Sequence, residues 1–369
     1  MQRFTLIILF LISGVLHART VRIAALYPIS QPANYDRSGL EAWCVTKSVL
    51  EDAKKNGLDI TFDPFNISAD PIYTGVVAKQ IVKQNYDIAI GTLVSVQALA
   101  AAPIFEAAKV PFIVPTASHP DVTHGRKYAT RIPFNDFRQA ELLAKLTASD
   151  LRPKSVAIIR NVSEPYSNFL GKEYAKKLHE LAPQIEVKDY PVLNGFNNHA
   201  ELIESILKEK RELIFVPLIQ SNVSSFYSEL SKQGAKVTLL GSDIVENDVD
   251  FLGALGNISP HIRFIFVQHW DRLLRGPGAS LYRRIRQTSC SKYPDSMVAS
   301  AAFDSTMLLV EALRAKKTFS KEEFIPTIRS LSFSGLMGAI VYGSDGDPIK
   351  PIQLFTVDKT KTVFLKEFP

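Results

Sequence analysis

The feature that most constrains this chain is the alternation, from Val21 onward, of short apolar runs with longer amphipathic stretches. An apolar run of about 4–8 residues is typical of a buried strand, and apolar residues at helical spacing predict a helix. In the first series, the expected strands are 21–26, 59–65, 88–91 and 111–114, and the expected helices are 38–56, 72–84 and 96–108. Because these strands are apolar on both faces, they predict a parallel sheet covered by helices on both sides.

A second series of the same kind follows the first. Its expected helices are 139–149, 166–181, 199–210 and 223–233, and its expected strands are 155–160, 186–190, 213–216 and 237–240. The chain should end with a strand at 264–267, helices at 279–289 and 297–316, and a β-rich tail around 338–342, 352–357 and 363–365. Two such series in 369 residues predict an α/β fold with two doubly wound lobes and parallel-rich sheets.

The amino terminus reads as a secretory signal peptide. Arg3 precedes an apolar run from Phe4 to Ile12, and small residues lead up to Ala18, after which we expect cleavage. A membrane anchor is the alternative, but this run is shorter than the ~20 residues that a bilayer requires. No cysteine follows the cut, so a lipid anchor is not expected. The sequence therefore predicts an exported, soluble protein.

The two cysteines, Cys44 and Cys290, exclude a disulfide-rich scaffold and any zinc module built on cysteines. In an oxidising compartment they could form a disulfide, provided that the fold brings their Cα atoms within about 7 Å. Two unpaired, buried thiols are an equal alternative, and the sequence leaves the choice open.

Charge and motifs exclude several classes of function. The 43 Lys and Arg against 37 Asp and Glu give a net charge of +6 spread along the chain, which does not suit a nucleic-acid-binding protein. Arginines cluster between 272 and 286, a pattern more typical of a solvated helix face than of a docking surface. No phosphate-binding Gly-x-x-x-x-Gly-Lys-Ser/Thr loop and no Gly-x-Ser-x-Gly elbow is present. His119 and His124 lack the spacing of a metal pair, so no metal site is expected. Because the motifs named above are missing, no catalytic residue and no cofactor are expected either.

Polar residues follow several of the expected strands, where ligands bind in open α/β sheets. Ser95 follows the strand at 88–91 and opens a helix, and Ser118 follows the strand at 111–114. Their hydroxyls, with the backbone amides near Thr116 and Ala117, would suit a ligand carboxylate. Simple helix capping is the alternative for each serine.

An α-amino group on the ligand would need an acidic partner. Asp243 follows the strand at 237–240 and is the candidate, with Glu246 as a second choice. Helix capping is again the alternative for Asp243.

Several segments, in a fixed order, carry a resemblance to a known family. They are Pro28 with Tyr35, DIAIGTLVS (87–95), VPFIVPTAS (110–118), SVAII (155–159) with Tyr166, LGSD (240–243), AFDS (302–305), and SG (334–335) followed by DGD (345–347). In the order and spacing of these segments the mature chain resembles, over nearly its whole length, the leucine/isoleucine/valine-binding protein family of type I periplasmic binding proteins.

The resemblance implies two lobes joined by three crossovers. Lobe 1 would comprise 19–134 and 270–337, and lobe 2 would comprise 135–269 and 338–369. It also implies a monomeric clamp in the periplasm that closes on a small ligand, such as an amino acid, an amide or a small carboxylate. The clamp would then present this ligand to the membrane subunits of an ABC importer.

The resemblance also assigns site residues. Ser95 and Ser118 match the positions that bind the ligand carboxylate, Asp243 matches the acidic position, and Tyr35 and Tyr166 match aromatic positions on the two walls of the cleft. A surface or core tyrosine is the alternative for both aromatic residues.

The chain departs from the family pattern at Leu218–Ser221, where it has no tyrosine. This difference leaves the ligand open among aliphatic and polar amino acids, amides, urea-like molecules and other small carboxylates. Two other functions also stay open. One is a sensory protein of the same fold, and the other is an exported enzyme, for which no nucleophile–base pair or metal site is visible in the sequence.

Overall fold

The computed structural model describes residues 20–30, 36–68, 70–245, 249–256, 258–269, 276–293, 296–358 and 361–368. The expected signal peptide, Tyr35, Glu246, Arg272 and Arg275 lie outside the described residues.

The first lobe is built on a parallel sheet in the order β2-β1-β3-β4-β5. Its strands are β1 (Val21–Tyr27), β2 (Ile60–Asn66), β3 (Ile88–Gly91), β4 (Phe112–Val114) and β5 (Ala129–Arg131). Its helices are α1 (Asp36–Lys55), α2 (Pro71–Lys83), α3 (Ser95–Ala107), α9 (Ala279–Gln287), α10 (Met297–Arg314) and α11 (Lys321–Ser330). A short 3-10 helix, η1 (Pro120–Val122), lies between β4 and β5.

Side chains of β1 alternate between two cores, as expected for a strand covered on both faces. Ile23 and Ala25 pack with α1, α9, α10 and α11, whereas Ala24 and Leu26 pack with α2 and α3. The parallel sheet with two helical layers that the sequence predicts is therefore confirmed.

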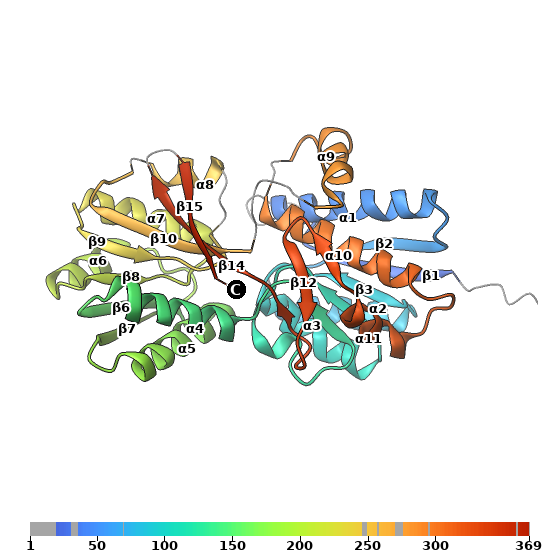
Figure 1. The fold of residues 1–369 in the computed structure, drawn as a ribbon, viewed down its shortest axis with the longest axis horizontal. Helices are drawn as coiled ribbons and strands as arrows, with labels where there is room; N and C mark the ends of the chain where they lie inside the picture. The colour runs from blue at the N-terminus through green and yellow to red at the C-terminus, as the bar shows by residue number, and fades with distance from the viewer. Residues whose placement is uncertain are drawn as a thin grey trace, which may run out of the picture.

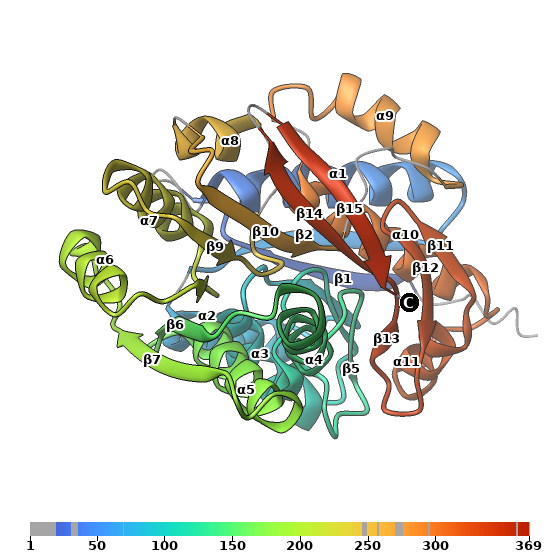
Figure 2. The ribbon, with the colours of Figure 1, turned by 60° about the vertical axis from the view of Figure 1, so that its left-hand side comes forward.

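The second lobe is built on a seven-stranded sheet in the order β15-β14-β10-β9-β8-β6-β7, in which β14 pairs antiparallel with both β10 and β15 and the other neighbours pair parallel. Its strands are β6 (Ser155–Asn161), β7 (Glu186–Val192), β8 (Leu213–Phe215), β9 (Val237–Leu240), β10 (Ile262–Gln268), β14 (Ile352–Asp358) and β15 (Lys361–Phe368). Its helices are α4 (Asp136–Leu146), the π-helical turn η2 (Thr147–Leu151), α5 (Pro165–Leu181), α6 (His199–Lys208), α7 (Gln220–Lys232) and α8 (Val249–Leu255). Figure 2 shows β14 and β15 lying against β10 at one edge of this sheet.

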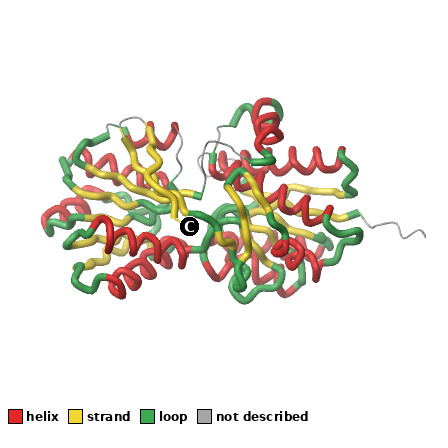
Figure 3. The backbone as a smooth tube through the Cα atoms, in the orientation of Figure 1, coloured by secondary structure: helices red, strands yellow, loops and turns green. Residues whose placement is uncertain are grey.

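The second sheet is also covered on both faces. Ala157 and Ile159 of β6 face the core formed with α6, α7 and α8, and Val156 and Ile158 face the core formed with α4 and α5. The two lobes lie side by side (Figure 1), and loops connect them near the middle of the molecule (Figure 3).

A third, antiparallel sheet joins β11 (Phe333–Gly335), β12 (Gly338–Tyr342) and β13 (Pro348–Ile349). Phe333 and Ile340 of this sheet belong to the core that α1 and α10 form in the first lobe. The family resemblance implies that the last change of lobe lies near residue 338. Because β12 packs on the first lobe and β14 joins the second sheet, we propose that this crossing lies between β13 and β14 instead.

The disulfide question left open by the sequence has an answer in the fold. Cys44 on α1 and Cys290, which follows α9, form a disulfide with a Cα–Cα distance of 5.9 Å. The bond joins segments 246 residues apart and lies within the first lobe.

Candidate ligand-binding cleft

A cleft of about 1070 Å³ opens between the two lobes, where the first turns of several helices meet. Its first-lobe wall comes from the start of α1, α3 and α10 and from the loop after β4. Its second-lobe wall comes from α5, α7 and α8 and from the loops before α6 and after β9. Helix N-termini point unpaired N–H groups into such a space, which suits an anionic ligand.

The turn between β3 and α3 positions Ser95 on the first-lobe wall. Gly91 has φ 134°, and a Cβ atom there would lie 2.2 Å from the Leu26 carbonyl oxygen, so only glycine fits. Thr92 follows at φ 65°, a rare conformation for a β-branched residue and one that is found most often at functional sites. The Gln97 side chain accepts a hydrogen bond from Leu93 N at 2.9 Å, which fixes the start of the helix.

The loop after β4 lies against this turn. The Thr116 hydroxyl donates to the Leu93 carbonyl at 2.6 Å, and the backbone N–H of His119 donates to Ser95 Oγ at 3.3 Å. Ser95, Thr116, Ala117 and Ser118 all line the cleft, so the structure brings these four candidates together. Ser95 Oγ accepts a hydrogen bond from the protein, which leaves its own hydrogen to donate to a ligand.

Asp243 and Tyr166 lie on the opposite, second-lobe wall of the cleft. The Tyr166 hydroxyl and Gln139 Nε2 both donate to Asp243 Oδ1, the latter at 2.9 Å. His269 Nε2 lies 2.7 Å from Asp243 Oδ2. Tyr35, the remaining candidate, lies outside the described residues.

These hydrogen bonds set the charge of the second-lobe wall. Burial alone would raise the pKa of Asp243, but the hydrogen bonds from His269, Tyr166 and Gln139 outweigh it and lower that pKa. Burial and the nearby Asp243 raise the pKa of Tyr166 well above its ordinary value. Burial lowers the pKa of His269. The wall therefore presents a buried carboxylate that three side chains hold by hydrogen bonds.

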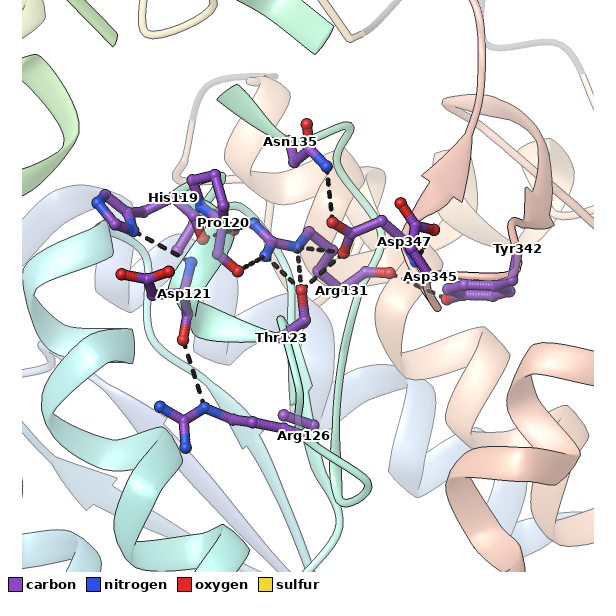
Figure 4. Close-up of polar contacts among 12 residues, drawn as sticks. His119, Pro120, Asp121, Thr123, Arg126, Arg131, Asn135, Tyr342, Asp345 and Asp347 are labelled. Atoms are coloured by element: carbon purple, nitrogen blue, oxygen red, sulfur yellow. Dashed lines mark hydrogen bonds and ion pairs between the residues drawn. The ribbon is translucent and has the colours of Figure 1, made fainter. Parts of the chain in front are cut away.

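An ion pair next to the loop after β4 connects β5 to the third sheet (Figure 4). Arg131 on β5 is completely buried and donates from Nε to Asp347 Oδ1 at 2.9 Å. Asp347 lies in the turn between β12 and β13, and its Oδ2 accepts from Asn135 Nδ2 at 2.7 Å. The remaining guanidinium nitrogens donate to the carbonyls of His119 and Pro120, each at 2.9 Å. This network ties the first crossover to the third sheet.

His119 has a structural role in the same region. Its Nδ1 accepts a hydrogen bond from Asp121 N at 3.2 Å and caps the 3-10 helix η1. Among the residues that the structure describes, no group of three or more His, Cys, Asp or Glu side chains is arranged to hold a metal ion. In that same part of the chain, no helix combines the length and apolar character needed to cross a bilayer.

Several residues that line the cleft were not predicted from the sequence. Arg37, Ser38 and Glu41 lie on the first turns of α1, and Glu164 and Ser296 cap α5 and α10. Ser296 Oγ donates to Glu41 Oε2 at 2.7 Å. The second-lobe wall also includes the α7 serines Ser221, Ser224, Ser225 and Ser228. The rule that selects Ser95 would have selected Glu164, which lies between β6 and α5, but not Ser296, because α10 follows the helix α9 and not a strand.

A family model described as periplasmic binding protein matches residues 20–362 of the chain. The Leu/Ile/Val-binding protein of Citrobacter freundii is 20% identical over 244 residues, which cover 64% of this chain and 65% of that relative. A leucine-, isoleucine-, valine-, threonine- and alanine-binding protein of Pseudomonas aeruginosa is 22% identical over 234 residues, 62% of each chain. The matched segments thus span less than two thirds of these relatives' own length.

Solved structures share the fold over nearly the whole chain. A leucine-binding protein of Thermotoga maritima superposes with a TM-score of 0.83 at 21% identity and covers 94% of this chain and 98% of its own. A solute-binding protein of an ABC transporter from R. palustris, in complex with 4-hydroxybenzoate, has a TM-score of 0.82 at 18% identity and covers 95% and 97%. These likenesses confirm the predicted α/β class with parallel-rich sheets. Because the family model spans almost all of the described residues, the chain belongs to the periplasmic binding protein family.

Proposed function

We propose that this protein is a periplasmic solute-binding protein that clamps a small carboxylate-bearing ligand between its lobes and delivers it to an ABC importer. The observation that carries this proposal is that the two walls of one cleft have different chemistry. Hydroxyl and amide groups of 95 and 116–118 face the Asp243 and Tyr166 wall of the other lobe. The protein would act as a monomer after removal of the signal peptide, and it would not be an enzyme.

The ligand carboxylate would bind on the first-lobe wall. The hydroxyls of Ser95 and Ser118 would donate to it, together with backbone amides near Thr116 and Ala117. The Thr116 hydroxyl is engaged by the Leu93 carbonyl, so Thr116 would contribute through its backbone. Neutral donors can bind a carboxylate strongly when the site excludes water.

The second-lobe wall would hold the rest of the ligand. Tyr166 would cover its apolar part, and Asp243 would face a positively charged group where the ligand has one. Contacts from both lobes are complete only in the closed state, so the ligand stabilises closure by its higher affinity for that state.

The comparisons support a carboxylate as the shared recognition element. The relatives are described as binding leucine and other amino acids, and a structural neighbour holds 4-hydroxybenzoate. These ligands have a carboxylate in common and differ in whether they carry an ammonium group. The disulfide between Cys44 and Cys290 also suits an oxidising compartment such as the periplasm.

The proposal can be tested by ligand screening of the mature protein, unfolded and refolded to remove any carried ligand. Amino acids, benzoates, short-chain carboxylates, amides and urea would be screened by thermal shift, and any hit would be measured by calorimetry. Loss of a hydrogen bond to a carboxylate costs roughly 1.5–3 kcal/mol, so Ser95→Ala and Ser118→Ala should each raise Kd about 10- to 100-fold.

Ser291→Ala is the matched control, because Ser291 is an exposed serine of the first lobe outside the cleft, and its Kd should match the wild type. A panel without any hit would contradict carboxylate transport and favour the sensory alternative. A hit that is insensitive to both cleft substitutions would place the ligand elsewhere.

A further inference from the structure

A second carboxyl group lies behind the cleft, on the first crossover. Asp136 opens α4, has no exposed surface, and donates its backbone N–H to the Ser118 carbonyl at 3.1 Å. Its Oδ1 accepts from Gln139 Nε2 at 3.2 Å. Its Oδ2 is buried and has no hydrogen bond of ordinary geometry among the described residues, although the Ser118 hydroxyl lies close enough to lower the pKa of Asp136. Asp136 thus contacts the loop that carries one proposed ligand group, Ser118.

Gln139 links this carboxyl group to the other side of the cleft. The same Nε2 atom donates to Asp243 Oδ1 at 2.9 Å, so the two carboxyl oxygens lie within about 6 Å of each other. Gln139 Oε1 accepts from the backbone N–H of Asp243 at 2.9 Å, which holds the amide in this orientation. Gln139 therefore fixes two acidic side chains, one on the crossover and one on the second-lobe wall, close together in a buried space.

The surrounding charges do not neutralise both acids. His269 contacts Asp243, and Tyr166 donates to the same carboxylate, but burial keeps His269 from gaining a proton easily. The charge of Arg131 acts on Asp136 and lowers its pKa, but the Arg131 guanidinium is hydrogen-bonded to Asp347. Lys350 is paired electrostatically with Asp304, and its charge also lowers the pKa of His269. Glu164 adds a further negative charge that acts on Asp136. Within the described residues, no Arg or Lys side chain donates a hydrogen bond to Asp136 or Asp243.

We infer that Asp136 is a positioning residue of the ligand site: in the empty cleft it holds a proton while its neighbour Asp243 is ionised, and it releases that proton to solvent when a ligand ammonium group binds beside Asp243. The inference rests on the proposed function, and it adds Asp136 to the proposed ligand site and accounts for the charge of the two acids there. Two carboxylates this close in a buried site repel each other, which favours a proton on one of them unless a cation joins them. The ligand ammonium group would be that cation.

The direction of the exchange follows from the two environments. Burial and the charge of Asp243 raise the pKa of Asp136 well above its ordinary value, whereas hydrogen bonds lower the pKa of Asp243. The one proton of the pair therefore resides on Asp136. A ligand with an ammonium group should bind with release of up to one proton, and its affinity should rise with pH by up to about tenfold per pH unit. A carboxylate without an ammonium group leaves the proton in place, so its affinity should not rise with pH.

The first test measures the pH dependence of binding with two matched probes. L-leucine and 4-methylpentanoate differ only in the ammonium group, and calorimetry from about pH 5.5 to about pH 8.5 in buffers of different ionisation enthalpy counts the protons released. We expect release with leucine alone, and its loss in Asp136→Asn, which keeps the shape of the side chain. Equal pH profiles for leucine in the wild type and in Asp136→Asn would overturn the inference.

The second test needs no ligand. Infrared spectroscopy of the empty protein near neutral pH should show the carbonyl band of a protonated, buried carboxyl group, and Asp136→Asn should abolish it. In Asp243→Asn the remaining carboxyl group of Asp136 should lose its proton at lower pH, which gives the same answer if Asp136→Asn does not fold. A wild type without the band would overturn the inference. If neither probe binds but the band is present, the acid pair stands and only carboxylate binding fails.

Discussion

At the scale of single residues, the loop between β13 and β14 carries a buried lysine. Lys350 is 1% exposed, and the negative charge that acts on its ammonium group is that of Asp304 on α10. The Asp304 carboxylate accepts hydrogen bonds from the backbone N–H groups of Leu336 and Met337, both at 2.8 Å. A Cβ atom on Gly335 would lie 2.3 Å from this carboxyl group, so the turn beside it requires glycine. Burial lowers the pKa of Lys350 to about 8.

This buried lysine predicts a pH-dependent stability. Between about pH 8 and 10.5 the unfolded chain keeps the lysine proton while the folded protein has lost it, so the free energy of unfolding should rise with pH by up to about 1.4 kcal/mol per unit. That gain is lost as the pH falls through about 8. Lys350→Met should lack this rise, as measured by urea unfolding at several pH values. The control is Lys316→Met at an exposed lysine, and a Lys350→Met profile parallel to the wild type would contradict the prediction.

At the scale of elements, the buried ion pair between Arg131 and Asp347 connects β5 to the β12–β13 turn. Removing one partner of a buried ion pair leaves the other charge without compensation and typically costs about 3–5 kcal/mol. Asp347→Ala should therefore lower the free energy of unfolding by about that amount, as measured by urea unfolding. Asp358→Ala removes an exposed carboxylate at the end of β14 and should change it little. Equal losses in the two variants would show that the turn is not held through Arg131.

The elements also show which parts of the fold could be predicted from the sequence. The long amphipathic helices were placed to within about three residues, since their apolar spacing is regular. The short elements β5, α8, α11, β11 and β13 were not predicted. In β5, Ala129-Thr130-Arg131 has no apolar pattern, because its charged residue is buried by a partner more than 200 residues away. No local signal can identify such a strand.

At the scale of the whole molecule, the disulfide between Cys44 and Cys290 closes a loop of 246 residues. Removing a native disulfide typically costs 2–5 kcal/mol, largely by freeing the unfolded chain, so Cys44→Ala with Cys290→Ala should lower the melting temperature. Dithiothreitol should lower it in the wild type and leave the double variant unchanged. Because both cysteines lie in the first lobe, ligand affinity at moderate temperature should be retained. A melting temperature unaffected by the double substitution would contradict the prediction.

The sequence by itself determined the alternation of strands and helices and the two lobes, because both follow from local apolar periodicity. It also determined that Ser95, Ser118 and Asp243 follow strands, at the strand ends where ligands bind in open α/β sheets. Only the tertiary structure decided that Cys44 pairs with Cys290 and that Arg131 pairs with Asp347. Only the tertiary structure shows that Asp136 and Asp243 both accept hydrogen bonds from the Gln139 side chain. These contacts join residues far apart in the chain, so their geometry exists only once the lobes and crossovers have formed.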